Sequence, residues 1–274
     1  MRFFRPRGRS DASRMTGTPV AQTKALYEAG RYAEAEAEAR AVARSRPRDD
    51  AYAAVALNFA ALATGAQGRH AEALATYDEA LPAFSRIFGV GHWLTLKLRS
   101  DRAQQLTSLG RYAECEAECA ALARAASRGT DPQMSLLTTA ARNGLVFALN
   151  AQGRHQEAEA FAREALANHC APDRLSLVLQ LGLARSLNGQ ARHEEALSEA
   201  QGADKLYRAL PEHQRRPDTG AVELALAKSL LGQGRSPEAR LQATAAHDAC
   251  RASFGPDHSR TVEAQTLLDR IDGA

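Results

Sequence analysis

One six-residue frame recurs along the chain of 274 residues and constrains its fold more than any other feature. The frame is a turn residue, an arginine, two variable positions, a glutamate and a small residue. Successive copies begin 38, 42, 43, 38 and 43 residues apart, at Gly30, Gly68, Gly110, Gly153, Ala191 and Gly234. Self-similarity at a period of a few tens of residues predicts stacked repeats, in which each repeat buries its apolar face against its neighbours.

The segments on either side of each frame have helical patterns, and the turn residue, usually glycine, tolerates the left-handed conformation that ends a helix. The predicted helix pairs are 20–29 with 32–45, 51–66 with 70–88, 94–109 with 112–127, 132–151 with 155–168, 174–188 with 193–210, and 219–231 with 236–253. A last single helix, 259–271, is expected to cap the stack. We therefore predict one all-α domain over residues 19–272, a right-handed α-solenoid of somewhat less than one superhelical turn.

Two columns of small residues run through every copy. Counted from the turn residue, the position five residues later holds Ala35, Ala73, Cys115, Ala158, Ala196 and Ala239. The position seven residues earlier holds Thr23, Ala61, Ala103, Val146, Ala184 and Ala227. Two antiparallel helices need small side chains where their backbones cross closely, so these columns predict the inner contacts of each pair.

The frame and its two small columns resemble the tetratricopeptide repeat, over about residues 20–271. The phrase Phe254-Gly-Pro-Asp-His258 is similar to the linker of kinesin-light-chain-type repeats, and Phe88-Gly-Val-Gly-His92 is a looser match. The sequence departs from the family pattern in two places. Residues such as Arg142 and Gln180 replace an aromatic early in the first helix, and the aromatic of the second helix survives only as Tyr77.

The resemblance implies that the first helices line a concave groove that holds an extended peptide or a helix of a partner protein. Asparagine can bond both groups of an extended backbone, and lysine or arginine suits a carboxylate. We expect a protein or peptide ligand with acidic side chains or a free C-terminus. The alternative is that these are ordinary solvated polar residues. The candidate groove residues are Lys24, Asn58, Lys97, Gln104, Asn143, Asn150, Arg185, Asn188 and Lys228.

Histidine and cysteine give no pattern that favours a metal or a nucleophile. One frame position is tyrosine in two copies and histidine in three, which favours packing over metal binding; the histidines are His70, His155 and His193.

Cys115 and Cys119 share a helix face and could chelate a metal or sense oxidation, but Cys115 falls in a small column and core packing is favoured. No phosphate-binding glycine loop or nucleophile elbow is present. We expect no enzyme activity and no cofactor, and small-molecule ligands are disfavoured.

The charge balance of the chain does not favour a polyanion as its partner. The net charge is +3, but the first fourteen residues carry five arginines and one aspartate, and the remainder has 30 basic against 31 acidic residues. Residues 1–18 are expected to be a disordered basic tail, and a nucleic-acid contact through it is the weaker hypothesis. No apolar run approaches the roughly 20 residues of a membrane span, so a cytoplasmic protein with free thiols is predicted. Arginine greatly outnumbers lysine, which suggests a bacterial source.

The predicted function is a non-catalytic scaffold or adaptor for protein–protein interaction. The alternative is a regulatory sensor that binds a signalling peptide and acts on a transcriptional or signalling partner in trans. The identity of the partner and the oligomeric state do not follow from the sequence.

Overall fold

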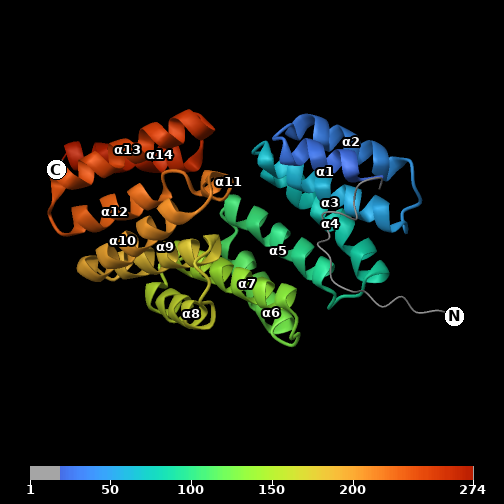
Figure 1. Cartoon of the computed structure of the whole chain (residues 1–274), viewed down its shortest axis with the longest axis horizontal. Coiled ribbons are helices and arrows are strands. Elements are labelled where there is room, and N and C mark those ends of the chain that lie inside the picture. Colours follow the sequence, from blue (N-terminus) through green and yellow to red (C-terminus); the bar gives the residue numbers. More distant parts are fainter. Residues whose placement is uncertain (1–18, 274) are drawn as a thin grey trace. The chain divides into compact units, whose positions relative to one another are not determined.

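The computed structural model describes residues 19–273, in which the secondary structure is helical and no strand occurs. The predicted tail, 1–18, lies outside the described residues. The chain divides after Arg111 into two compact units (Figure 1). Unit 1 contains α1 (Ala21–Glu28), α2 (Tyr32–Arg44), α3 (Ala51–Ala66), α4 (His70–Ile87) and α5 (Trp93–Ser108). Unit 2 contains α6 (Tyr112–Ala126), α7 (Pro132–Ala151), α8 (His155–Asn168), α9 (Arg174–Gly189), α10 (His193–Ala209), α11 (Glu212–Arg215), the 3-10 helix η2 (Arg216–Asp218), α12 (Ala221–Gly232), α13 (Ser236–Phe254) and α14 (Ser259–Asp272).

The prediction of helix–turn–helix repeats is confirmed. Three predicted helices, 51–66, 132–151 and 155–168, have the observed bounds, and the other predicted bounds are within two residues of those observed. The predicted pairs α1 with α2, α3 with α4, α7 with α8, α9 with α10 and α12 with α13 pack together, and α14 packs on α13. The two helices of the third pair, α5 and α6, fall in different units. The right-handed superhelical course stays a prediction.

Both columns of small residues are buried, which explains why the pairs pack closely. Every member of the column after the turn, from Ala35 to Ala239, is at most 1% exposed. Every member of the earlier column, from Thr23 to Ala227, is at most 2% exposed. Larger side chains would push the two helices of a pair apart at their crossing.

The turns explain the glycine of the frame. At Gly153 the backbone has φ 75°, and the next amide, that of Arg154, donates to the carbonyl of Leu149 at 2.9 Å to close the helix end. Ala191 adopts the same left-handed conformation, φ 59°, although it carries a Cβ atom. It is the only non-glycine residue with positive φ in the described part of the chain.

Two kinds of cap begin the first helices. Asp50, Asp131 and Asp173 accept hydrogen bonds from amides of the first turn, the pattern expected of an aspartate N-cap. The two histidines of the linker phrases do the same: His92 Nδ1 accepts from Leu94 N and His258 Nδ1 accepts from Arg260 N. Both histidines thus have a structural role at the start of a helix.

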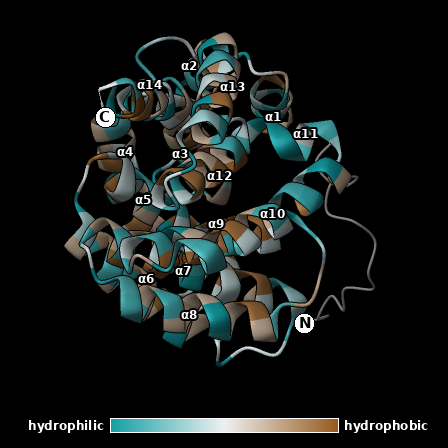
Figure 2. Cartoon of the chain, turned by 90° about the vertical axis from the view of Figure 1, so that its left-hand side faces the viewer, coloured by the Kyte–Doolittle hydropathy of each residue, from teal (hydrophilic) through white to brown (hydrophobic). Residues whose placement is uncertain are grey.

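In unit 2 the first helices α7, α9, α12 and α14 lie side by side, and the second helices pack behind them. Apolar side chains of α12, α13 and α14 form one core cluster at the C-terminal end, which includes Leu224, Ala243, Leu267 and Ile271. The hydropathy colouring of Figure 2 shows α12 as largely apolar and the outer turns of α8 as hydrophilic. Among the described helices, none combines the length and apolar character that a bilayer crossing requires.

Candidate functional site

The exposed face of the α7–α9–α12–α14 layer carries a row of partly exposed side chains from successive repeats. Phe147 of α7, Arg185 of α9 and Lys228 of α12 each stand six residues before the turn of their own repeat. Phe147 is 38% exposed, and the side chains of Arg185 and Lys228 are 39% and 35% exposed. We call these three residues, together with Glu263 of α14, the first-helix face of unit 2.

Two predicted groove cations meet at one carboxylate of the chain itself. Arg185 Nη2 lies 3.2 Å from Oε1 of Glu263, and Lys228 Nζ donates to the same oxygen. Glu263 and Arg185 are 78 residues apart in sequence. The structure therefore brings Arg185 and Lys228 together, as a charged site for an acidic group requires.

The electrostatics of Glu263 follow from this arrangement. Burial by itself would raise the pKa of the Glu263 carboxyl, but the positive charges of Lys228 and Arg185 outweigh it and hold the pKa below its ordinary value. The two cations therefore stabilise an anion that is partly withdrawn from water. Two positive charges against one negative charge leave this face with a net positive charge.

Aromatic surface adjoins the cations. The guanidinium carbon of Arg185 lies 5.3 Å from the centroid of the Phe147 ring, within the range of a cation–π contact. The Phe147 ring is in turn 6.4 Å, centroid to centroid, from that of Tyr112 on α6. The row thus offers a flat apolar surface beside a fixed positive charge.

Asn150, which we predicted to bind a ligand backbone, is buried and bonded to other residues of the chain. Its side chain is only 6% exposed, and Nδ2 donates to the carbonyl of Gly182 at 3.0 Å and to Ser186 Oγ at 2.9 Å. Its Oδ1 lies 2.9 Å from Nδ1 of His155. The bonds to Gly182 and Ser186 join the fourth repeat to the fifth, so the Asn150 amide makes an inter-repeat contact, and its assignment to a ligand stays a prediction.

Asn188 repeats this arrangement one junction later. Its Nδ2 donates to Ser229 Oγ at 2.9 Å, and its Oδ1 lies 3.0 Å from Nδ1 of His193. The packing role predicted for the histidine column is confirmed at both junctions. Asn188 is half-buried, and its amide is already bonded to Ser229 of the next repeat and to His193 of its own.

Unit 1 makes the same histidine contact with a different partner. The residue three before the turn of the second repeat is Gly65, and Gln105 of the next repeat occupies the space that its side chain would take. Gln105 Oε1 lies 2.9 Å from Nδ1 of His70. A long side chain from the next repeat thus replaces the missing asparagine.

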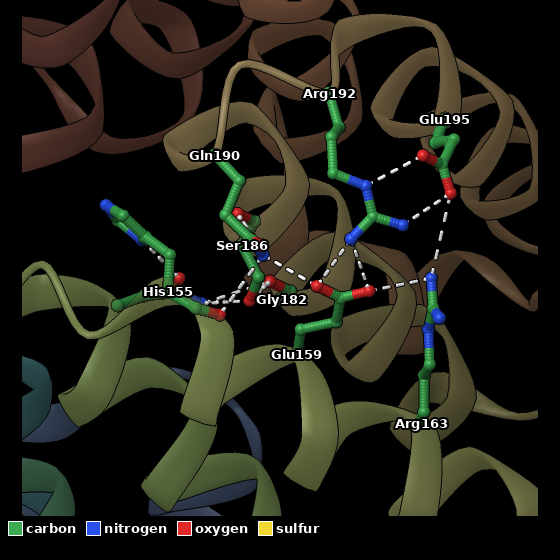
Figure 3. Close-up of polar contacts among 9 residues, drawn as sticks. His155, Glu159, Arg163, Gly182, Ser186, Gln190, Arg192 and Glu195 are labelled. Carbon is green, nitrogen blue, oxygen red and sulfur yellow. Dashed lines mark hydrogen bonds and ion pairs between the residues drawn. The ribbon is translucent and has the colours of Figure 1, made fainter.

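A second set of hydrogen bonds and ion pairs joins neighbouring repeats at their turns (Figure 3). Arg192 donates through Nη1 to both oxygens of Glu159, each at 2.7 Å, and through Nε and Nη2 to Glu195. Gln190 Nε2 donates a further bond to Glu159 at 2.6 Å. Arg163, which lies on α8 with Glu159, is 2.8 Å from the Glu159 carboxylate. We call this arrangement the turn clamp. It explains why the frame contains both an arginine and a glutamate.

The turn clamp occurs at two further junctions. Arg154 and Gln152 bind Glu116, and Arg69 and Gln67 bind Glu36. Burial by itself would raise the pKa of Glu159, but hydrogen bonds from Gln190 and Arg192 outweigh it and lower the pKa of the carboxyl below its ordinary value. The turn clamp does not form between the fifth and sixth repeats. The position of the fifth repeat that corresponds to Glu159 is Leu197, which packs in the core.

The remaining predicted cations lie in unit 1 and have internal partners. Lys24 Nζ lies 3.2 Å from Glu28 of the same helix. Lys97 Nζ lies 2.5 and 2.6 Å from the two oxygens of Asp101, whose residue is 8% exposed. Burial raises the pKa of Asp101 above its ordinary value even though Lys97 opposes it. Asp101 is therefore a buried partner of Lys97.

The other predicted groove residues differ in burial. Gln104 of unit 1 is exposed, whereas Asn58 of unit 1 and Asn143 of unit 2 are half-buried. The Oδ1 atom of Asn58 and the hydroxyl of Tyr77 are buried without a hydrogen-bond partner. The assignment of these residues to a ligand stays a prediction.

The two cysteines of α6 are buried in the core. Cys115 and Cys119 are at most 3% exposed, with their sulfur atoms 3.9 Å apart. The Cys119 thiol packs on Gly144 of α7, where an added Cβ would approach it to 2.5 Å. Within residues 19–273, no group of three or more His, Cys, Asp or Glu side chains is placed to hold a metal ion.

Family comparisons match the repeats directly. Residues 138–169, which cover most of α7 and α8, and residues 220–240, which begin at α12, match family models described as tetratricopeptide repeat. The chain contains tetratricopeptide repeats. No curated protein matches it.

Solved tetratricopeptide-repeat structures share the fold at low sequence identity. TPR-like repeats of a protein described as a kinesin light chain of Podosopora anserina align with TM-score 0.58 and 16% identity, over 73% of this chain and 97% of that one. Acl4, the assembly chaperone of RpL4, aligns with TM-score 0.54 and 16% identity, over 92% and 93%. A tetratricopeptide repeat protein from Parabacteroides merdae gives 0.50 and 17%, over 92% and 97%. These likenesses show the fold.

The departures from the tetratricopeptide pattern have local explanations. Arg142, which replaces an aromatic of the first helix, pairs with Glu164 of α8 at 2.7 Å. Cys119, which stands where the second repeat has Tyr77, fits against Gly144 because it is smaller. Ion pairs and small side chains thus replace stacked rings between these helices.

Two features of the site were not predicted from the sequence. Glu263 follows the last frame, so the repeat columns gave no reason to place it beside Arg185. The arginine of the frame was visible, but its bond to a glutamate of the preceding repeat, one residue beyond that repeat's frame, was not. Aligning the copies would have shown that Glu36, Glu116 and Glu159 share the position six residues after the turn.

Proposed function

We propose that the protein is a non-catalytic, cytoplasmic adaptor that binds an acidic segment of a partner protein on the first-helix face of unit 2. The observation that carries the proposal is the convergence of Arg185 and Lys228, from two successive repeats, on a single carboxylate oxygen. A pair of cations already placed to hold one carboxylate can keep its position when another carboxylate takes the place of the first. Preorganisation of this kind lowers the entropic cost of binding.

The surroundings of the cations favour a peptide over a free anion. Phe147 and Tyr112 extend the face beside Arg185 with aromatic surface, which can cover the apolar part of a peptide side chain. The half-buried Asn143 lies on the same helix as Phe147, where its amide could bond a peptide backbone. A segment with an acidic residue next to an apolar one fits this order of side chains.

Relatives of the fold support a role in binding proteins. Tetratricopeptide repeats are typical of protein–protein interaction scaffolds. Acl4, which shares the fold, is named as the assembly chaperone of another protein. The alternative, a sensor that acts on a partner in trans, would use the same face with a signalling peptide as its ligand.

The test uses a decapeptide of alternating Glu and Thr, labelled with fluorescein and amidated at its C-terminus. Its binding to the full chain is measured by fluorescence anisotropy beside that of the same peptide with Gln at each Glu position. Arg185→Gln combined with Lys228→Gln is expected to weaken binding of the acidic peptide by about tenfold, since charge-assisted bonds are lost at partly exposed positions. Arg235→Gln combined with Arg240→Gln removes two positive charges elsewhere and serves as the matched control.

Three comparisons interpret the result. Preference for the acidic peptide, lost in the Arg185/Lys228 variant and kept in the control, supports the proposal. Equal loss in both variants means that net charge and not this face attracts the peptide. A peptide with a free C-terminus that binds far more tightly than the amidated one would assign the cations to a terminal carboxylate.

A further inference from the structure

Glu263 lies on the surface of the first-helix layer. It belongs to α14, which packs on α13 and α12, yet its carboxylate reaches Arg185 of α9, on the far side of α12. A side chain that spans two neighbouring helices in this way crosses the exposed side of the helix between them. The Glu263 carboxylate therefore occupies the path that a ligand lying across the layer would take.

The helix that carries Glu263 has other means of attachment. Ala264, Leu267 and Ile271 bury one side of α14 in the core of unit 2. Thr261 Oγ1 donates to the carbonyl of Gly255 at 2.9 Å, and Arg260 donates to the carbonyl of Thr219 at 2.8 Å. Because α14 is held by these contacts, the Glu263 ion pairs are not needed to dock it.

The ion pairs themselves are partly open to solvent. The side chain of Glu263 is 35% exposed, and its two partners are exposed to a similar extent. Pairs of this kind add little to stability, since water competes for both charges. Their main effect is on the charge that the face presents.

Resting on the proposed function, we infer that Glu263 is an internal competitor for the carboxylate subsite formed by Arg185 and Lys228. An acidic side chain of the partner takes the place of the Glu263 carboxylate against these cations and moves it aside. Glu263 thereby sets the affinity for Arg185 and Lys228 that a partner must exceed. An isolated acidic residue competes poorly with Glu263, and a segment with several acidic residues displaces the Glu263 carboxylate.

The test is a substitution that removes the internal charge and keeps the shape. Glu263→Gln is expected to bind the Glu/Thr decapeptide at least about fivefold more tightly than the natural chain, because a repelling negative charge is gone and both cations are released. Glu238→Gln is the matched control. It also removes one negative charge from unit 2, but from an exposed pair with Arg235 on the turn side. Its affinity should stay close to that of the natural chain.

Further variants separate competition from indirect effects. Glu263→Asp keeps the charge on a shorter side chain and should give less gain than Glu263→Gln. Adding Arg185→Gln to Glu263→Gln should remove most of the gain. Circular dichroism melts of each variant establish that the helical fold is kept, and amide hydrogen exchange within α14 establishes that this helix remains folded.

The outcomes are distinct. If Glu263→Gln binds no more tightly than Glu238→Gln, or more weakly than the natural chain, the inference is overturned while the proposed function stands. If neither the natural chain nor Glu263→Gln distinguishes the acidic peptide from its Gln counterpart, the proposed function fails and the inference fails with it.

Discussion

Arg192 binds both oxygens of Glu159 across the junction between two tetratricopeptide repeats, and each bond is 2.7 Å long. Glu159 belongs to the second helix of one repeat and Arg192 to the turn of the next. Arg192 also binds Glu195 within its own repeat. One guanidinium therefore fixes the position of the turn relative to α8, which carries Glu159, and α10, which carries Glu195. The turn clamp thus contributes to the orientation of the first helices, including α9, which carries Arg185.

The first prediction concerns the charge of Glu159. Glu159→Gln should lower the free energy of unfolding by about 1 kcal/mol at pH 7, since it weakens partly buried charge-assisted bonds. Glu195→Gln, which removes the exposed bond within the repeat and a longer, 3.9 Å ion pair with Arg163, should lower the melting temperature less. Thermal melts followed by circular dichroism measure both, and equal losses would contradict a special role for the bond between repeats.

This contribution depends on pH in a defined direction. The pKa of Glu159 is lower in the folded protein than in the unfolded chain, so the stabilisation is complete above the ordinary glutamate pKa of about 4.3. It is lost as the pH falls through the lower, folded-state pKa. The difference in melting temperature between the natural chain and Glu159→Gln should therefore shrink below about pH 4. A difference that stays constant down to pH 3 would mean that shape and not charge is responsible.

The second prediction tests the contact between His155 and the next repeat. An added Cβ at Gly189 would lie 2.3 Å from the His155 ring, which Asn150 holds in place. Gly189→Ala should therefore destabilise the natural chain, although alanine favours a helix over glycine by up to about 1 kcal/mol. In a His155→Ala background the same substitution should become neutral or stabilising. A double-mutant cycle on melting temperatures measures this reversal, and the absence of coupling would show that the ring moves aside freely.

The fold could be predicted because each repeat has the same packing and turn requirements, which appear as the same residue types at the same positions. A small residue at Ala158 or Ala196 and a left-handed turn at Gly153 recur at fixed offsets, so one copy supports the interpretation of the next. The site could be predicted only in part. Arg185 and Lys228 share a column and were predicted as candidates, but Glu263 lies outside every frame and approaches Arg185 across 78 residues.

Asparagine was the less predictable residue type. Asn150 stands three residues before a turn, in a column that the tetratricopeptide pattern assigns to the groove. Its burial depends on Ser186 and Gly182 of the following repeat, which accept its hydrogen bonds. A position in one repeat does not reveal whether the next repeat supplies acceptors, so a polar residue at a groove position can be structural.

The third prediction concerns the turn that lacks glycine. Ala191 has φ 59°, a conformation that costs a residue with a Cβ atom about 1 kcal/mol or more. Ala191→Gly should therefore stabilise the chain by about 1 kcal/mol, partly offset by the greater freedom of glycine in the unfolded state. Gly153→Ala is the converse control. Its Cβ would meet no atom within 4 Å, so any loss there comes from the backbone. Melting temperatures that move in the same direction for both variants would contradict the argument.

The fourth prediction concerns the histidine that begins the terminal helix. His258 Nδ1 accepts the amide hydrogen of Arg260 at 3.2 Å, and its ring stacks on Phe254 at 4.4 Å between centroids. His258→Ala should destabilise α14 by about 1 kcal/mol, the usual cost of losing an N-cap, and amide hydrogen exchange within α14 should become faster. His258→Asn restores a capping oxygen without the stacked ring and should recover most of the protection. If asparagine proves as damaging as alanine, the contact with Phe254 and not the cap holds the start of the helix that places Glu263.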